Sequence, residues 1–329
     1  MNPTRDQILD LLKAADGHFV SSREICSVLN TSRTAVWKHI HALVQQGYEV
    51  EAVTNKGYRL AGNADLVTTR ELEAYIATRV LGRRVIYQAT VDSTNRAAGR
   101  LADEGVPEGT LVLADEQTEG HGRWNREWVS PPRTGILMSL ILRPPLPVTD
   151  SSMLTSLAAV AVAKALEKIV RVQVAIKWPN DIMIDRKKTG GILIDVSAEG
   201  NWLRYAVVGV GINANSLASM FPDVLQPHIS SLREVLGRPV RRAEVAAAIL
   251  AEFEARYEAS VGHGDFSAVL KELRDLSDTI GRHVEVDAGH GKLTGVAEGI
   301  ADDGALILRL AGGQVKKLFS GDIVSARVR

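Results

Sequence analysis

The spacing of apolar residues changes twice along this chain, and this change limits its architecture more than any other feature. Residues 1–63 show helical spacing that ends in a short alternating pattern, residues 64–276 mix strand-like runs with helical stretches, and residues 277–329 hold only short strand-like runs separated by glycines. A chain of 329 residues is long enough for two or three domains of about 100–200 residues each. We therefore expect a multidomain α+β protein with these three domains.

The first stretch predicts three short helices followed by a two-stranded hairpin. Helices are expected near residues 7–14, 22–29 and 33–44, and Ser32 or Thr31 is suited to cap the third by accepting a hydrogen bond from its free amides. A turn at 54–57 separates two alternating runs. This order is that of a winged helix-turn-helix domain, whose third helix enters the major groove of DNA.

Polar and basic side chains on this third helix and on the hairpin are the candidates for DNA contacts. They are Ser32, Arg33, Thr34, Trp37, Lys38, His41, Lys56 and Arg59. The domain is barely basic, because residues 1–62 hold seven Lys or Arg against six Asp or Glu. Two other interpretations stay open, namely charges that only face water and a helix-turn-helix that mediates protein contacts.

The middle stretch predicts a mixed sheet with helices packed on it. Strands are expected at 85–91, 110–114, 136–142, 172–178, 191–196 and 205–212, and helices at 154–170 and around 245–257. Because strands and helices do not alternate strictly, a mixed sheet is favoured over a doubly wound fold. The last stretch has runs at 283–286, 292–296, 305–310, 313–318 and 323–328, and it predicts a small β-barrel or sandwich.

Composition and charge exclude several classes of protein. The chain is 45% hydrophobic and 24% charged, so it is not globally disordered. Its net charge of zero rules out a chain-wide basic field for nucleic acid or membrane. The N-terminus lacks the apolar core of a signal peptide, and charges interrupt the apolar stretch at 153–170. With the single cysteine Cys26, these features predict a cytoplasmic protein without a membrane segment.

The usual catalytic motifs are missing from the middle stretch. It has no phosphate-binding loop of the Gly-x-x-x-x-Gly-Lys type, no Gly-x-Ser-x-Gly elbow, and no histidine pair at metal-ligand spacing. Gly209-Val210-Gly211 resembles a dinucleotide fingerprint, but without a surrounding βαβ unit we interpret it as a glycine-rich strand end.

Two glycine–basic segments remain as candidate anion sites. Residues 117–128 combine glycines, which let backbone amides approach an anion, with arginines that present a fixed fork of donors. Residues 177–181 and 187–193 bring lysines to a Gly-Gly strand start, where an ammonium group can lie inside a cleft. On this evidence alone, an ordinary mobile turn is an equally acceptable interpretation of the first segment, and a solvated turn is the more common interpretation of the lysine pair in the second.

Together these segments resemble the motifs of the bifunctional biotin–protein ligases that also act as biotin operon repressors. The order and spacing agree from one end of the chain to the other, and the set is far more specific than any single motif. The matching segments are Ser93-Thr94-Asn95, residues 117–123, Lys177-Trp178-Pro179-Asn180-Asp181, residues 188–193, Gly209–Asn213, residues 32–40 and residues 56–60.

The resemblance implies a two-step reaction and a role for each matched residue. Biotin and Mg-ATP form biotinyl-5′-AMP, and a lysine of a biotin carboxyl carrier protein then takes the biotin. Lys188 and Arg123 are the implied catalytic residues, and Trp128 walls the pocket. The implied biotin site is Ser93, Thr94, Asn95, Gln117, His121, Gly122, Arg123 and Lys188, and the implied nucleotide and Mg²⁺ site is Lys177, Asn180, Asp181 and Asn213. No metal ligand is assigned individually, and Asp181 alternatively braces its loop.

The resemblance also implies a winged-helix repressor domain, a mixed-sheet ligase domain and an SH3-like C-terminal barrel. In such repressors biotinyl-5′-AMP is the corepressor and promotes a homodimer that binds a palindromic operator. The loop departs from the family pattern, with His121 in place of arginine, Trp124 in place of a smaller or basic residue and Asn125 in place of glycine. This departure bears on retention of biotinyl-5′-AMP. A lipoate–protein ligase and a non-enzymatic biotin-sensing DNA-binding regulator are the alternatives.

Overall fold

The computed structural model describes residues 3–61, 65–289 and 291–327. The chain divides into two compact units, Met1–Glu71 and Leu72–Arg329. The predicted boundary between residues 63 and 64 and residue 328 of the last predicted strand lie outside the described residues, and the predicted boundary at 276 stays a prediction.

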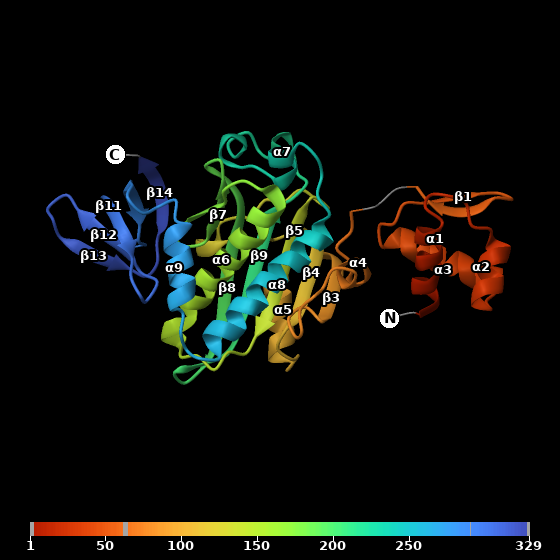
Figure 1. Ribbon diagram of the computed structural model, residues 1–329, viewed down its shortest axis with the longest axis horizontal. Coiled ribbons are helices and arrows are strands. Elements are labelled where there is room, and N and C mark those ends of the chain that lie inside the picture. Colours follow the sequence, from red (N-terminus) through yellow and green to blue (C-terminus); the bar gives the residue numbers. More distant parts are fainter. Residues whose placement is uncertain (1–2, 62–64, 290, 328–329) are drawn as a thin grey trace. The chain divides into compact units, whose positions relative to one another are not determined.

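The first unit has the predicted winged helix-turn-helix order. It comprises α1 (Pro3–Ala14), α2 (Ser22–Leu29), α3 (Arg33–Gln45), β1 (Val50–Val53) and β2 (Gly57–Leu60), and α4 (Thr69–Glu73) begins before its end (Figure 1). Ser21 and Ser32 cap α2 and α3 by accepting hydrogen bonds from backbone amides three residues on, at 3.1 and 3.2 Å. Ile8, Val36 and Leu43 form part of the buried core that holds the helices together.

The second unit is built on a seven-stranded mixed sheet in the order β3-β4-β5-β9-β8-β7-β6. Only β3 and β4 pair in parallel, which confirms a mixed sheet. The strands are β3 (Arg84–Val91), β4 (Thr110–Gln117), β5 (Gly135–Leu142), β6 (Ala175–Lys177), β7 (Asp181–Ile184), β8 (Lys187–Glu199) and β9 (Trp202–Asn213).

Helices cover the two faces of this sheet unequally. The helices α6 (Ser151–Val170), α8 (Arg242–Val261) and α9 (Ser267–Asp275) lie over one face, and α5 (Thr94–Asp103) contacts the other; α7 (Leu232–Leu236) lies in the segment after β9 (Figure 1). Strand alternation explains the division, because Leu111 of β4 belongs to the larger core cluster and the adjacent Val112 to the smaller one. The open part of the α5 face is therefore where a cavity has room.

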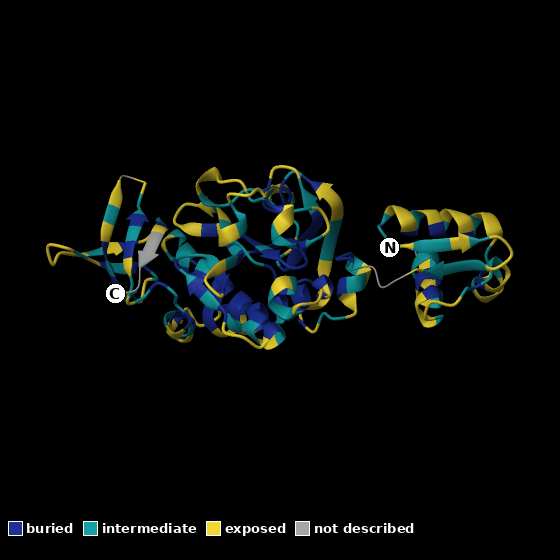
Figure 2. Cartoon of the chain, turned by 90° about the horizontal axis from the view of Figure 1, so that it is seen from above, coloured by how far each residue is buried: buried dark blue, intermediate teal, exposed yellow. Residues whose placement is uncertain are grey.

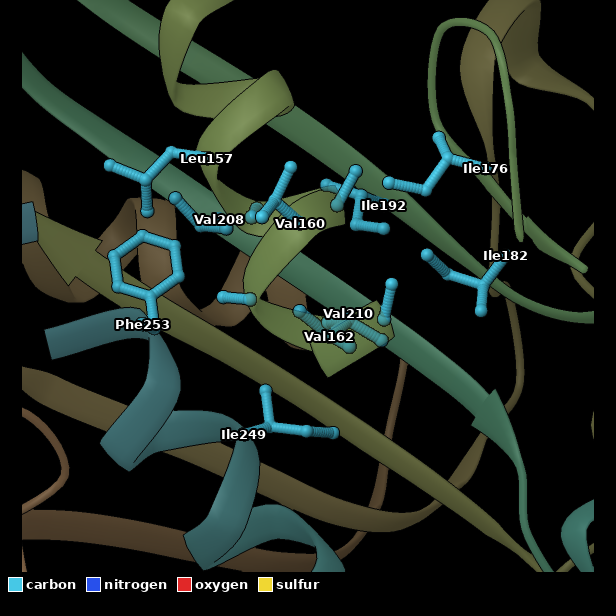
Figure 3. Close-up of a cluster of buried hydrophobic side chains, with 14 of the residues drawn as sticks. Leu157, Val160, Val162, Ile176, Ile182, Ile192, Val208, Val210, Ile249 and Phe253 are labelled. Carbon is cyan, nitrogen blue, oxygen red and sulfur yellow. The ribbon is translucent and has the colours of Figure 1, made fainter. Parts of the chain in front are cut away.

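The larger core interlocks α6 and α8 with the middle of the sheet. Figure 3 shows Val160 of α6 and Phe253 of α8 directed toward the β8 and β9 side chains Ile192 and Val208. Figure 2 shows the buried residues within the layers and the exposed ones mainly in turns and on outward faces. None of the described helices is long and apolar enough to cross a membrane.

The C-terminal strands form one antiparallel sheet, but barrel closure is not confirmed. They are β10 (His283–Asp287), β11 (Lys292–Ile300), β12 (Leu306–Leu310), β13 (Val315–Leu318) and β14 (Asp322–Arg327), in the order β13-β12-β11-β10-β14. Within the described residues the outer strands β13 and β14 do not pair with each other, so the sheet remains open at its edges.

Several elements of the middle stretch differ from the sequence expectation. The strand expected at 172–178 is only Ala175–Lys177, and Arg171 before it ends α6 in a left-handed conformation. The following segment forms the additional strand β7, and the residues after the Ser93 motif form the helix α5, neither of which was expected.

Candidate active site

A cavity of about 890 Å³ opens on the α5 face of the sheet, at the centre of the second unit. Its walls come from the start of α5, the end of β4, the loop at 120–128, the β6–β7 turn and the beginning of β14. Strands β8 and β9 form its floor. The cavity therefore gathers side chains that are far apart in the sequence.

Glycines make this floor thin enough for large side chains to lie on it. A β-carbon added at Gly209 would lie 2.1 Å from Oδ1 of Asn95, and one added at Gly211 would lie 2.8 Å from Cε2 of Trp128. Any side chain at either position would displace its neighbour. The Gly-x-Gly pattern is thus part of a strand under the cavity, as the strand-end interpretation held, and not a dinucleotide fingerprint.

The inner end of the cavity is bordered by a web of hydrogen-bonding groups that are uncharged apart from Asp195. The Oε1 atom of Gln117 accepts hydrogen bonds from the amide and the hydroxyl of Thr94, at 2.8 and 3.0 Å. The Ser139 hydroxyl bridges Thr94 and Asn95, with its Oγ 2.6 Å from Oδ1 of Asn95. Asn95 in turn donates to Oδ2 of Asp195 at 2.8 Å. Because its amide is engaged on both sides, Asn95 holds the web rather than presenting a free group to a ligand.

The other end of the cavity is charged and more open. Nζ of Lys188 lies 2.6 Å from Oδ1 of Asp181 and 5.5 Å from the centre of the Trp128 ring. Side-chain exposures are 35% for Lys188 and 21% for Asp181, so the pair remains accessible from the cavity. A lysine held over an aromatic ring and against a single carboxylate is available to a second, stronger anion.

Arg123 is held by the first residues of β14. Its guanidinium donates to the Gly321 carbonyl at 2.9 Å and lies 3.4 Å from Oδ1 of Asp322. Arg126 pairs with the other oxygen of Asp322 at 2.7 Å. Burial lowers the pKa of the Arg123 guanidinium and the nearby carboxylates oppose this shift, yet arginine keeps its charge in a protein.

The loop that carries Arg123 makes an unusual turn. Trp124 and Asn125 both adopt left-handed backbone conformations, with φ of 58° and 55°. Asn125 tolerates this conformation, whereas Trp124 does so at a cost of about 1–2 kcal/mol. The backbone of His121 forms an isolated antiparallel β-bridge with that of Glu127. The Nδ1 atom of His121 lies 3.3 Å from the Glu119 carbonyl oxygen.

The turn between β6 and β7 places the next set of predicted residues. Lys177, Asn180 and Asp181 line the cavity, and Asn180 donates to the Ile192 carbonyl at 2.7 Å. The backbone amide of Trp178 donates to Thr279 at 3.0 Å. The turn is therefore fixed to β8 on one side and to the segment before β10 on the other.

Most of the predicted ligand-binding residues line this one cavity, and Asn213 is the exception. Ser93, Thr94, Asn95, Gln117, His121, Gly122, Arg123, Lys177, Asn180, Asp181 and Lys188 all line it. Asn213 is not among the lining residues; it is buried at the end of β9 and donates to the Ser230 carbonyl at 3.1 Å.

Comparisons with known proteins agree with this arrangement. Residues 87–213 match the biotin/lipoate A/B protein ligase family, residues 4–59 match a helix-turn-helix domain and residues 279–324 match the biotin protein ligase C-terminal domain. The bifunctional ligase/repressor BirA of Bacillus subtilis is 42% identical over 97% of this chain and 98% of its own length. This chain belongs to the BirA family of bifunctional ligase/repressors.

Further relatives agree with this family membership. The biotin–[acetyl-CoA-carboxylase] ligase of Paracoccus denitrificans is 33% identical over 67% of this chain and 92% of its own length. The biotin protein ligase of Aquifex aeolicus, solved in complex with biotin and ATP, is 28% identical with a TM-score of 0.64 and covers 75% of this chain and 100% of its own. The predicted family is confirmed, and with it the two functions, biotin ligase and repressor.

The first unit of this BirA-family chain, which contains the helix-turn-helix domain, presents a polar face on α3. Arg33, Thr34, Trp37, Lys38 and His41 are all exposed. The Trp37 and His41 rings stack with centroids 5.5 Å apart. Ser32 is engaged as the helix cap, and Arg59 is partly engaged because it pairs with Glu51 at 2.6 Å and lies over the Phe19 ring; Lys56 stays exposed.

Several residues that line the cavity or hold its lining residues in place were not found from the sequence. Ser139 and Asp195 complete the hydrogen-bond web, and Asp322 holds two arginines of the loop. Each is a common polar residue on a strand, outside every recognisable motif. Only the position of Asp322 directly after a glycine turn offered any signal, and that signal is shared by many surface turns.

Proposed function

We propose that the cavity joins biotin to ATP and then delivers the biotin to a lysine of a biotin carboxyl carrier protein. The observation that carries this proposal is the division of the cavity into a neutral, hydrogen-bonding end and a cationic end. Such a cavity suits a substrate with a neutral polar head and an anionic tail. Biotin has this form, with a ureido head and a carboxylate.

The neutral end would bind the head of biotin. Ser93, Thr94 and Gln117 present hydroxyl and amide groups there, and Asn95 fixes their positions through Ser139. Trp128 lies along the floor and walls the pocket. We assign His121 and Gly122 to the rim of the same site, because both line the cavity next to Arg123.

The cationic end would carry the chemistry of adenylation. The biotin carboxylate attacks the α-phosphate of ATP, which brings two anions together and needs fixed positive charge where negative charge accumulates. Lys188 supplies that charge by exchanging Asp181 for the reacting anions, and Arg123 holds the mixed anhydride once it forms. No enzyme nucleophile is required, since the acceptor lysine comes from the partner.

The remaining polar residues would organise the nucleotide. Lys177, Asn180 and Asp181 face the cavity, and Asn213 would act through the loop that it anchors at Ser230. Among the described residues no three acidic, histidine or cysteine side chains come together as a metal site. A single carboxylate such as Asp181 nevertheless fits Mg²⁺ that arrives on ATP phosphates, because Mg²⁺ commonly keeps its waters and takes one or two protein ligands.

Intact-mass analysis of a biotin carboxyl carrier domain tests this proposal directly. The domain is incubated with the protein, biotin and Mg-ATP, and pyrophosphate is measured in parallel. A biotin-sized mass gain that requires every component supports the ligase, and replacing biotin with lipoate tests the lipoate-ligase alternative. If neither the mass gain nor pyrophosphate appears, the result contradicts the enzyme and leaves a biotin-sensing DNA-binding regulator.

We propose further that biotinyl-5′-AMP is the corepressor and promotes a homodimer that binds a palindromic operator in the cytoplasm. A twofold dimer presents two copies of the α3 face to two half-sites. The nearly neutral charge of the domain supports this, because one copy alone has little electrostatic attraction to DNA. Operator binding is measured with and without biotin and ATP, using Trp37→Ala as the variant. Binding that is absent or independent of ligand would contradict the corepressor role.

A further inference from the structure

A second cavity, of about 530 Å³, lies beside the first and meets it at Arg123. The two share five lining residues, namely Arg123, Trp178, Pro179, Ile192 and Leu193. The side chain that we assign to the mixed anhydride therefore faces both spaces. The lining of the second cavity includes neither Lys188 nor the residues of the neutral end, Ser93, Thr94 and Gln117.

The outer walls of this cavity come from three different elements. The first turns of α6 contribute the hydroxyls of Ser152 and Thr155, β8 contributes Ile194, and Phe319 lies in the turn between β13 and β14. Phe319 is 64% exposed, which is unusual for a large aromatic side chain beside a cavity. Its position at the outer side offers an apolar contact to a molecule that enters.

The charge of this second cavity indicates what it does not bind. Arg123 is its sole charged lining residue among those the structure describes. A triphosphate or pyrophosphate needs several cations, and these lie around the first cavity instead, at Lys177, Lys188 and Arg126. A neutral amine on an aliphatic stem fits better, because Trp178, Pro179 and Ile194 offer apolar walls and three hydroxyl-bearing residues of α6 offer hydrogen bonds.

We propose that this second cavity is the channel through which the acceptor lysine reaches biotinyl-5′-AMP. The inference rests on the proposed ligase function and adds the place where the protein substrate enters. The lysine stem lies along Pro179 and Ile194, and Phe319 contacts the acceptor surface. The two substrates of the second half-reaction thus reach Arg123 from two different cavities.

In the transfer step, the acceptor ε-ammonium first gives one proton to water. Its nitrogen then forms the amide bond with the biotinyl carbonyl carbon, and the bond from that carbon to the phosphate oxygen breaks. AMP leaves with the bonding electron pair, and the second amine proton passes to water. Thr155 and Ser152 accept hydrogen bonds from the amine before it reacts.

Filling the channel separates the two half-reactions. Thr155→Trp places a large ring in the second cavity, and we expect single-turnover biotin transfer to the carrier domain to fall about tenfold or more. Pyrophosphate release with biotin and ATP should stay within about twofold, because Thr155 does not line the first cavity. Thr149→Trp, an exposed position outside both cavities, is the matched control and should change neither rate.

A second, mild variant keeps the test independent of folding. Phe319→Ala removes an exposed ring and should raise the KM for the carrier domain without changing pyrophosphate release, whereas Val224→Ala, at a residue 75% exposed elsewhere, should change neither. Unchanged transfer in both channel variants would overturn the channel. A parallel loss of pyrophosphate release and transfer in Thr155→Trp would assign the cavity to ATP instead. Failure of the unmodified protein to release pyrophosphate would contradict the ligase proposal itself.

Discussion

The two ends of the main cavity are held in place in opposite ways. At the biotin end, buried neutral groups hydrogen-bond to one another, and Ser139, Thr94 and Asn95 are all at most 5% exposed. At the phosphate end, charged groups are paired with carboxylates of other segments, as in Lys188 with Asp181 and Arg123 with Asp322. One end is shaped before any ligand arrives, and the other is neutralised by groups that a ligand can replace.

This difference matches the demands of recognition and chemistry. A fixed array of buried polar groups rejects molecules that leave its members unpaired, which favours selectivity for one head group. A cationic end that is temporarily paired avoids the cost of isolated like charges while it remains open to a polyanion. Four variants test this difference between the biotin end and the phosphate end.

Lys188→Ala removes the central charge of the phosphate end. Pyrophosphate release should fall about 10²–10³-fold, because one preorganised donor to the reacting anion is lost. Lys187→Ala is the control, since Lys187 is the exposed neighbour on the same strand and does not line the cavity. Equal losses in the two variants would show that general charge, and not the position of Lys188, matters.

Gly209→Ala disturbs the hydrogen-bond web at the biotin end. The added β-carbon would lie 2.1 Å from Oδ1 of Asn95 and force this amide away from Ser139. Biotin affinity should weaken by about 10–100-fold, corresponding to about 1–3 kcal/mol for a broken buried hydrogen bond. Gly99→Ala, in α5 with open space around it, is the matched control. Biotin affinity is measured by calorimetry. If Gly209→Ala binds biotin as tightly as the unmodified protein, the web is not preformed.

Arg123→Gly should release biotinyl-5′-AMP into solution. Loss of one charged hydrogen-bonding side chain predicts dissociation faster by about tenfold. The comparison variant is Arg126→Gly, which removes the exposed partner of Asp322 and leaves Arg123 in the cavity. A dissociation assay in which Arg123→Gly retains the adenylate as well as the unmodified protein does would count against the role of Arg123.

Asp92→Asn tests the segment directly before the biotin end, with the smallest effect. Hydrogen bonds from Arg100 hold the pKa of Asp92 down, at about 2. A lowered pKa in the folded state stabilises the protein above the unfolded value near 3.8, and this contribution is lost as pH falls through about 2. The variant should lose about 1 kcal/mol or less at pH 7, since the pair is partly exposed. Urea denaturation should show this difference shrinking at acidic pH; a constant difference would contradict the assignment.

Sequence patterns were sufficient where one residue type serves one local purpose. The apolar stripe containing Val36, Ile40 and Leu43 predicts α3, and Ser32 does cap it. The motif residues around Lys188 and Arg123 predict a shared cavity, although their conformations were not predictable. Trp124 illustrates this limit, because a bulky side chain in a left-handed turn contradicts its local preference and is tolerated only in the folded loop.

Other features depend on contacts between distant segments and leave no local pattern. Helix α5 was missed because Gly99 interrupts a segment of low hydrophobicity, and it forms because Ala97, Ala98 and Ala102 pack on the sheet. Asp322 lies 199 residues from Arg123, and no spacing rule connects them. The C-terminal barrel was expected from short strands with glycine turns and from the family resemblance, and the strand pattern does not determine whether the edges of a sheet meet.

The glycine floor limits how this protein can be redesigned. Gly191, Gly209 and Gly211 already have the smallest possible side chain, so no exchange at these positions makes more room for an analogue of biotin. Extra volume has to come from the walls, where Trp128 and Leu137 are two of the large apolar residues that line the same cavity. A library aimed at bulkier ligands should therefore diversify those two positions and leave the three glycines unchanged.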